Sequence, residues 1–319
     1  MKKIFIFLFL FFVTLVAFSQ QEVQISHNMF NHMDVNPGYA GMNDAICATL
    51  IARQQWVGFK DPDGNKGAPQ TYLLSLDGAV NPLHGGLGMT IMQDQLGFEK
   101  NLGVKLSYAY KTVAGPGNIG IGAQIGFLSK KIDFTKFKYI DANDPLLVNG
   151  GKDESNMATD FAFGTFYNIP NKLYFGISAT QLSQAEITYS GILAKPTFAR
   201  HYYVEAGYYY PLPGNPSLEI DPSILIKSDL ASTQFDVSAL LKYNNQFWGG
   251  VSYRTVDAIV VLLGMNWKSF HFGYSYDITT SALGAKGRSS GSHEIMIGYC
   301  FKIIREFKPE SYKNPRFLS

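Results

Sequence analysis

Charged residues are scarce in this chain. Asp, Glu, Lys and Arg together make up 16% of its residues, against about 25% in an average soluble domain. Hydrophobic residues reach 46% and aromatic residues 14%, so the apolar content is not balanced by charge. The formal net charge of +2 is also too small to favour nucleic acid as a partner. The composition therefore disfavours a soluble domain covered with charge.

Long hydrophobic runs are missing from the body of the chain. Its longest apolar stretch, Ala258 to Met265, is far shorter than the ~20 residues that a membrane-spanning helix needs. In lipid, only helices and closed barrels satisfy the hydrogen bonds of the backbone. Any membrane crossing by this chain must therefore be made by strands.

The N-terminus has the pattern of a secretory signal. A positively charged start at residues 1–3 precedes an apolar run at 4–18. Small residues at the end of this run predict cleavage after Ser19 or one residue later, so the mature chain would begin near Gln20. A membrane anchor is the alternative, and the shortness of the run disfavours it.

Strict alternation of apolar with small or polar residues is the main structural pattern. In residues 118–127 five apolar side chains share one face, while Gln124 and three glycines share the other. In residues 102–111 a slip of one position would turn Lys105 toward lipid, at a cost of about 2–4 kcal/mol near the midplane. A soluble sandwich or propeller is the alternative, but its polar face would be rich in charge.

Applied to the whole chain, this pattern predicts about fourteen strands, an even number as is usual for bacterial barrels. The expected strands are residues 44–52, 71–80, 86–94, 102–112, 118–130, 158–168, 173–181, 199–210, 217–227, 233–242, 246–253, 257–265, 269–278 and 291–301. We therefore predict an all-β fold, a transmembrane antiparallel up-and-down β-barrel.

Long and short connections alternate along most of this barrel. Residues 53–70, 131–157, 182–198 and 279–290 form long connections, whereas 81–85, 169–172 and 211–216 are short; 228–268 is an exception with short links on both sides. Outer-membrane barrels have short periplasmic turns and longer outer loops, which places both termini in the periplasm. The expected parts are a signal peptide at 1–19, a periplasmic N-terminal segment at 20–43, an outer-membrane barrel at 44–301 and a periplasmic tail at 302–319.

The two cysteines belong to the first and last predicted strands. Closing the barrel brings Cys47 and Cys300 near the periplasmic end of one seam, and alternation points Cys300 inward. A disulfide is one possibility in this compartment, and two free thiols are the other. A Cα separation beyond ~7 Å would exclude the bridge.

Motifs of enzyme chemistry are weak. The match to G-x-S-x-G at 287–291 falls in a loop and not on a strand-turn-helix elbow. Inward His201 or His271 beside a serine is a further possibility. The stretch 61–67 resembles half of a calcium loop but lacks the Glu at its twelfth position, where Tyr72 stands. We predict no enzyme, no cofactor and no metal site, and leave calcium binding by an outer loop open.

Several stretches resemble one protein family. They are NPGYAGMND at 36–44, RQQWVGF at 53–59, PQTYLLSLDG at 69–78, GGLGMTIMQDQLGF at 85–98, SHEIMIGYCF at 292–301 and YKNPRFL at 312–318. In order and spacing this set is similar to the PorP/SprF family of type IX secretion membrane proteins. Gly38 stands where alanine is usual, which a loop tolerates.

The resemblance implies a bacterium of the Bacteroidetes type and a noncatalytic role in the cell outer membrane. It implies export or surface anchoring of a large adhesin that carries a type IX C-terminal signal, and in gliding members a part in motility. The implied partners are outer-membrane lipid, type IX components on the periplasmic side and the adhesin. The candidate partner-binding residues are Asn36, Pro37, Tyr39, Gly41, Arg53, Trp56, Tyr312, Asn314, Pro315 and Arg316.

Two other functions stay open. A passive channel or small-solute transporter would leave an open lumen, which the small inward residues do not exclude. A barrel enzyme is the third hypothesis, and it would rest on His201 or His271.

Overall fold

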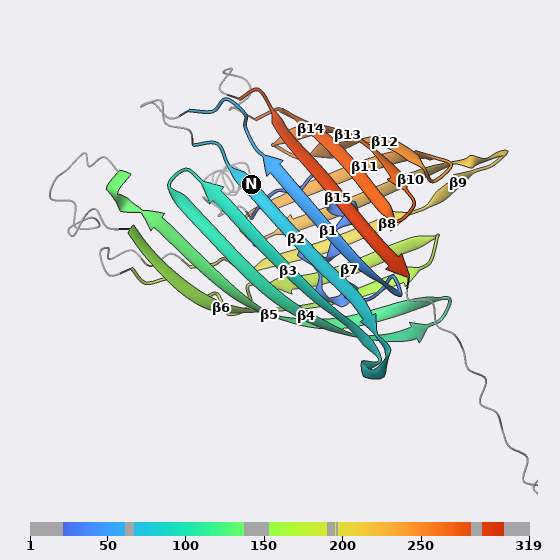
Figure 1. Ribbon diagram of the computed structural model, residues 1–319, viewed down its shortest axis with the longest axis horizontal. Helices are drawn as coiled ribbons and strands as arrows, with labels where there is room; N and C mark the ends of the chain where they lie inside the picture. Colours follow the sequence, from blue (N-terminus) through green and yellow to red (C-terminus); the bar gives the residue numbers. More distant parts are fainter. Residues whose placement is uncertain are drawn as a thin grey trace, which may run out of the picture.

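The computed structural model describes residues 22–60, 67–136, 153–189, 195, 197–281 and 289–302. These residues form one antiparallel sheet that closes into a barrel, because β1 pairs with β15 and β10 pairs with β11 (Figure 1). The strands are β1 (Ala45–Gln54), β2 (Gln70–Val80), β3 (Gly85–Leu96), β4 (Glu99–Ala114), β5 (Gly117–Asp133), β6 (Asp153–Ile169), β7 (Leu173–Thr180), β8 (His201–Tyr208), β9 (Tyr210–Leu212), β10 (Asn215–Ser228), β11 (Thr233–Tyr243), β12 (Phe247–Arg254), β13 (Ala258–Trp267), β14 (Phe270–Thr279) and β15 (Ser292–Lys302).

The predicted fold class is confirmed. Strands β8 and β9 are two parts of one crossing, because only Tyr209 separates them and both pair with β10. The fifteen labelled strands therefore make a closed antiparallel barrel of fourteen crossings. The remaining described elements are short 3-10 helices: η1 (Asn28–Phe30), η2 (His32–Asp34), η3 (Pro37–Tyr39), η4 (Asn81–Leu83) and η5 (Phe134–Lys136). Within the described part of the chain, no helix is long and apolar enough to cross a membrane.

Alternation sorts the side chains of each strand as lipid requires. In β4, Leu106 is 46% exposed on the outer face, whereas Ser107 is 4% exposed on the inner face. In β15, Ile295 and Ile297 point outward while Glu294 and Met296 are buried in the lumen. In a bilayer, lipid covers the large apolar side chains of the outer face, so they are not exposed to water.

The two ends of the barrel differ. We use the name short-turn end for the end at which β1 begins and β15 ends, where tight turns such as Gly115-Pro116 and Pro213-Gly214 join the strands. The opposite end, called the long-loop end, carries most of the long connections. At the short-turn end the β11–β12 turn uses left-handed backbone at Asn244 and Asn245, with φ values of 52° and 53°, which asparagine tolerates better than most residues.

Some strand ends lie beyond the predicted limits. Strand β5 continues to Asp133 and β6 begins at Asp153, although residues 131–157 were expected to form a loop. The charged residues there end the apolar alternation, but the hydrogen-bonded ladder continues past them, since pairing of the backbone does not require lipid. The predicted strand 199–210 is interrupted at Tyr209, and the pairing of β9 with β10 shifts register between Asn215 and Glu219.

The N-terminal segment lies inside the barrel. Its path starts near the long-loop end at Glu22 and reaches the short-turn end at Asp44, where β1 begins, and Figure 1 shows its blue ribbon behind β1 and β15. The sequence predicts a periplasmic N-terminal segment at 20–43. The described part of that segment instead packs against the inner faces of the strands, as the contacts below establish.

Candidate functional site

Residues 22–44 fill much of the lumen, and we call them the plug. They contain η1, η2 and η3 and otherwise lack regular structure. Most of their side chains are buried or half-buried, including His27 at 0% and Met33 at 1% exposure. A segment without a regular backbone ladder must satisfy its polar groups against the wall, so the inner faces of the strands decide how the plug is held.

Five charged wall residues meet near the long-loop end, and we call them the charged cluster: Arg53, Asp236, Arg254, Asp277 and Glu294. Arg53 lies between Asp277, at 2.7 Å, and Glu294, at 3.1 Å. Arg254 bonds Asp236 at 3.0 Å and Asp277 at 3.2 Å. All five side chains are at most 1% exposed. Two guanidinium groups thus face three carboxylates, and Lys227 adds a further cation 3.7 Å from Asp236.

The plug completes this cluster through Ser26 and His27. The backbone N–H of Ser26 donates to Glu294 at 2.8 Å, and its hydroxyl lies 2.9 Å from Asp277 and accepts from Arg53 at 2.9 Å. The backbone N–H and the ring Nδ1 of His27 also bond Glu294, at 2.8 Å and 2.7 Å. Charge-assisted hydrogen bonds of this kind are the strong ones, so the cluster fixes this part of the plug.

A second polar contact lies farther along the plug. His32 Nδ1 is 2.7 Å from one carboxylate oxygen of Glu205 in β8, and Asn36 Nδ2 donates to the other at 3.0 Å. The amide of Asn36 also donates to the carbonyl of Thr165 in β6, while its oxygen accepts from the N–H of Gly38. Asn36 therefore fixes both the turn that begins η3 and its position on the wall.

Inward glycines receive the backbone of Asn36–Gly41. A Cβ added at Gly120 would lie 2.2 Å from the carbonyl oxygen of Gly38, and one at Gly122 would lie 2.3 Å from that of Pro37. A Cβ at Gly164 would lie 2.3 Å from Oδ1 of Asn36. We call Gly120, Gly122, Gly164 and Gly176 the glycine track. Only glycine leaves room for so close an approach of two backbones.

Two acidic residues of the plug, Glu22 and Asp34, have opposite pKa shifts. Burial raises the pKa of Glu22, but Lys105, His201, Lys227 and the hydrogen bond from Tyr203 outweigh it, and the pKa falls below its ordinary value. For Asp34 burial prevails: it raises the pKa above the ordinary value although Lys105 and Lys227 oppose it. The surroundings of Glu22 therefore favour its charged form, whereas those of Asp34 disfavour it.

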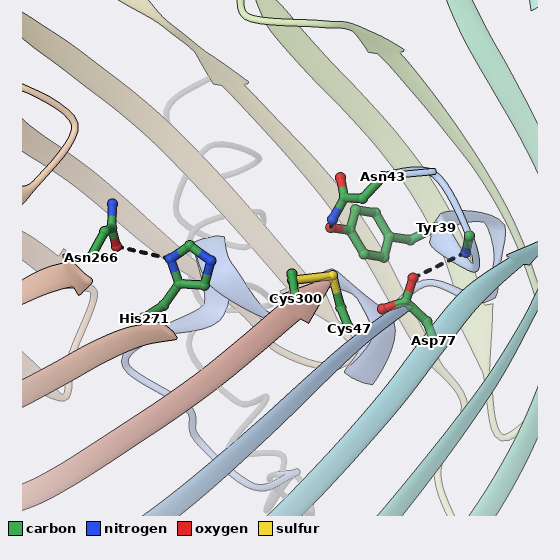
Figure 2. Close-up of a disulfide and its surroundings, with 8 residues drawn as sticks. Tyr39, Asn43, Cys47, Asp77, Asn266, His271 and Cys300 are labelled. Carbon is green, nitrogen blue, oxygen red and sulfur yellow. Dashed lines mark hydrogen bonds between the residues drawn. A yellow bond between two sulfur atoms is a disulfide. The ribbon is translucent and has the colours of Figure 1, made fainter. Parts of the chain in front are cut away.

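A cavity of about 280 Å³ lies between the plug and the wall on the short-turn side, and we call it the mouth cavity. Its lining includes Tyr39, Cys47, Asp77, Tyr174, Tyr209, Asp221, Lys242, Asn266, His271 and Cys300. Figure 2 shows several of them around the disulfide, with Asp77 accepting from the N–H of Gly41 and His271 bonded to Asn266.

Cys47 and Cys300 form a disulfide in this cavity, with their Cα atoms 4.1 Å apart. They face each other directly in the pairing of β1 with β15, so the bond joins the first strand to the last. Their separation is well within the limit of ~7 Å that would have excluded a bridge.

The sequence-derived candidates separate into distinct places. Asn36, Pro37 and Gly41 are buried between plug and wall, and half-buried Tyr39 packs against Phe166 with ring centroids 5.0 Å apart. Arg53 is 3% exposed, in the charged cluster. Trp56 is half-buried at the long-loop end, where its backbone N–H donates to the hydroxyl of Ser292. Tyr312, Asn314, Pro315 and Arg316 lie outside the described residues, as does the half calcium loop at 61–66.

The histidines considered for catalysis have structural partners. His201 Nδ1 contacts the side chain of Gln181 and the carbonyl of Ala199, and His271 Nδ1 contacts Asn266. In the described ranges, no three His, Cys, Asp or Glu side chains gather as they would around a metal ion.

Sequence reasoning missed Ser26, His27, Glu205, Arg254, Asp277 and Glu294. A usable signal existed for the wall residues, since each occupies an inward position by alternation, and charges on an inward face need partners. Nothing in the local sequence of Ser26 or His27 indicates a partner more than two hundred positions away.

Fold and lumen together define a β-barrel of the outer-membrane type whose interior is occupied by its own N-terminal segment. Solved structures of similar fold include the toluene transporter TbuX of Ralstonia pickettii, 12% identical over 86% of this chain and 93% of that one, with a TM-score of 0.51. The monoaromatic hydrocarbon channel CymD is 11% identical with the same coverage and TM-score. No curated protein matches the sequence. The chain belongs to the type IX secretion system membrane protein PorP/SprF family, whose pattern matches residues 17–299.

Proposed function

We propose that this protein is a noncatalytic docking component of the type IX secretion machinery in the outer membrane. In this proposal the leader at 1–19 is removed and the short-turn end faces the periplasm, where secretion components bind. Through these contacts the barrel supports the export or surface anchoring of a large adhesin that carries a type IX C-terminal signal.

The observation that carries the proposal is the plug. This segment bonds buried wall charges with its backbone and side chains, and it occupies the lumen that a passive diffusion pore keeps filled with water. A docking protein, by contrast, gains a rigid mouth, because the plug fixes the residues around the opening and keeps them in one geometry.

The candidate residues then divide by role. Asn36, Pro37 and Gly41 act by seating the plug, since they are buried against the wall. Arg53 acts in the same way through the charged cluster. The residues proposed to contact the partner directly are Tyr39, which lines the mouth cavity, and the tail residues Tyr312, Asn314, Pro315 and Arg316.

Deletion and copurification test this function together. A strain that lacks the gene should lose surface-attached adhesin, and the tagged protein should copurify with type IX components from native membranes. A strain that retains export and attachment of its adhesins, or a tagged protein that recovers none of these components, would contradict the proposal.

A passive channel or small-solute transporter is the alternative. Phe30, Leu240 and Met296 give part of the wall of the mouth cavity an apolar character, which favours this alternative. TbuX is described as a toluene transporter and CymD as a monoaromatic hydrocarbon channel. Planar bilayers distinguish the two functions. The full chain should give conductance near background if it docks proteins, whereas steady conductance or toluene flux would favour transport.

A further inference from the structure

The mouth cavity has an excess of negative charge. Asp77 and Asp221 both line it and are 8% and 7% exposed. Glu219 lies beside Asp221, because Lys242 forms ion pairs with both carboxylates. Lys242 therefore pairs with two of these carboxylates, and the third, Asp77, accepts from the N–H of Gly41, so the three carboxylates outnumber the lysine and can pair with a further positive charge.

Asp221 also has an unused hydrogen-bond acceptor. Its side chain is 10% exposed and its Oδ2 pairs with Lys242, yet its Oδ1 has no hydrogen-bond partner among the described residues. A buried carboxylate oxygen without a donor is costly. Rotation of the carboxylate toward the cavity would let a donor there reach this oxygen, and the hydrogen bond would remove that cost.

The aromatic wall suits a cation as well. Lys242 already lies over the ring of Tyr209, with Nζ 5.0 Å from the centroid, while it pairs with Asp221. Tyr39 and Tyr174 contribute further ring surface to the same cavity. An ammonium or guanidinium group on an aliphatic stem gains from both kinds of neighbour, the carboxylate and the ring face.

The direction of access follows from the fold. The plug closes the inner side of the cavity through Met29, Phe30 and Met33, while Asn266, His271 and Cys300 belong to the short-turn ends of their strands. A ligand therefore enters from the short-turn side and stops at the plug. The volume of about 280 Å³ admits one or two long side chains and not a folded domain.

We propose that the mouth cavity receives a lysine or arginine side chain from a segment of a partner protein that docks on the short-turn face. This inference rests on the proposed function and names the chemistry of the contact. It makes Asp77 and Asp221 specificity residues for a basic partner segment.

Binding of short peptides tests the inference. The type IX components that copurify with the protein supply the sequences for a set of overlapping acetylated peptides, and each peptide is titrated against the full chain in detergent by fluorescence anisotropy. The peptides that bind should be centred on Lys or Arg, and replacing that residue by Gln should weaken binding about tenfold.

Two substitutions in the wall should change this affinity in opposite directions. Asp221→Asn should weaken binding about tenfold, whereas Lys242→Gln should tighten it, because the competing internal cation is gone. Asp94→Asn is the matched control: it removes an inner carboxylate near the long-loop end, where Asp94 bonds Thr71, and should leave binding unchanged. A purely structural role of the cavity would not produce a gain in Lys242→Gln.

Three results would overturn the inference. They are binding peptides with acidic or apolar centres, equal affinity in Asp221→Asn and the parent, and tighter binding by a peptide of this chain's own residues 303–319 than by any partner peptide. Failure of the proposed function is recognised separately, since the parent protein would then recover no secretion component. Recovery that persists in the Asp77→Asn, Asp221→Asn double variant would contradict only the inference.

Discussion

The two halves of the plug are held by different physics. Near the long-loop end Ser26 and His27 bond the charged cluster, whose ion pairs are almost fully buried. Nearer the short-turn end the segment Asn36–Gly41 fits closely onto the glycine track, and single hydrogen bonds to Glu205 and Asp77 add to that fit. The first half is thus held mainly by a network of buried charges, the second mainly by close packing against glycines.

This difference decides how each half responds to change. A buried ion pair that loses one partner leaves an uncompensated charge, which costs about 3–5 kcal/mol. A glycine contact that gains a methyl group is overpacked, at about 1–3 kcal/mol. The charged half is thus the more sensitive to a single substitution, although both halves bury a similar kind of irregular backbone.

Arg254→Met should have the largest effect. The guanidinium is buried and bonds Asp236 and Asp277, so its loss should lower the free energy of unfolding by about 3–5 kcal/mol. Urea unfolding in phospholipid vesicles measures this. Arg200→Met is the control, because among the described residues Arg200 bonds Leu182 and Gln184 and no carboxylate. A loss below ~1 kcal/mol in Arg254→Met would refute the importance of the cluster.

Gly122→Ala should come second and act on the other half. Its Cβ would lie 2.3 Å from the carbonyl oxygen of Pro37, whereas a Cβ at Gly126 on the same strand would lie 3.6 Å from its nearest neighbour. We expect a loss of about 1–3 kcal/mol for Gly122→Ala and little for Gly126→Ala. Equal unfolding curves for the two variants would mean that the glycine track does not seat the plug.

Ser26→Ala should cost about 1–2 kcal/mol. The substitution removes a hydroxyl that bonds Asp277 and Arg53 but leaves the backbone bond to Glu294 intact. Ser228→Ala serves as the control, because Ser228 ends β10 and its hydroxyl bonds Ser232 and Thr233, outside the plug. If both variants unfold at the same urea concentration as the parent, the charged cluster is complete without the plug.

Asp44→Asn should have the smallest effect, below about 0.5 kcal/mol. Asp44 pairs with Lys111 at 2.8 Å where the plug leaves the lumen, but its side chain is 71% exposed. A loss of more than ~1 kcal/mol would show that the exit of the plug, and not its buried halves, determines its stability.

The strands were predictable because lipid imposes a rule on every residue in turn. Each strand must place apolar side chains outward, so the alternation in residues 102–111 or 118–127 contains both the strand and its orientation. Where lipid ends, the rule ends, and the sequence pattern consequently predicts a loop at the charged ends of β5 and β6, which the structure shows as strand.

The plug was not predictable in this way. Its residues have no period, its 3-10 turns are single, and its partners are distant, with Ser26 and Asp277 separated by 251 positions. The small inward residues of the wall were visible, but they fit an open lumen as well as a filled one. Only the resemblance of residues 36–44 to a family pattern marked part of the segment, and it gave no location.

Hydrogen–deuterium exchange of the full chain in detergent tests the central claim most directly. The backbone amides of Ser26 and His27 donate to buried Glu294, so we expect them to exchange as slowly as those of the strands around them. We also expect Arg254→Met to accelerate their exchange before that of β4 and β5. Exchange of residues 24–41 at the rate of an unstructured peptide in the unmodified protein would contradict it.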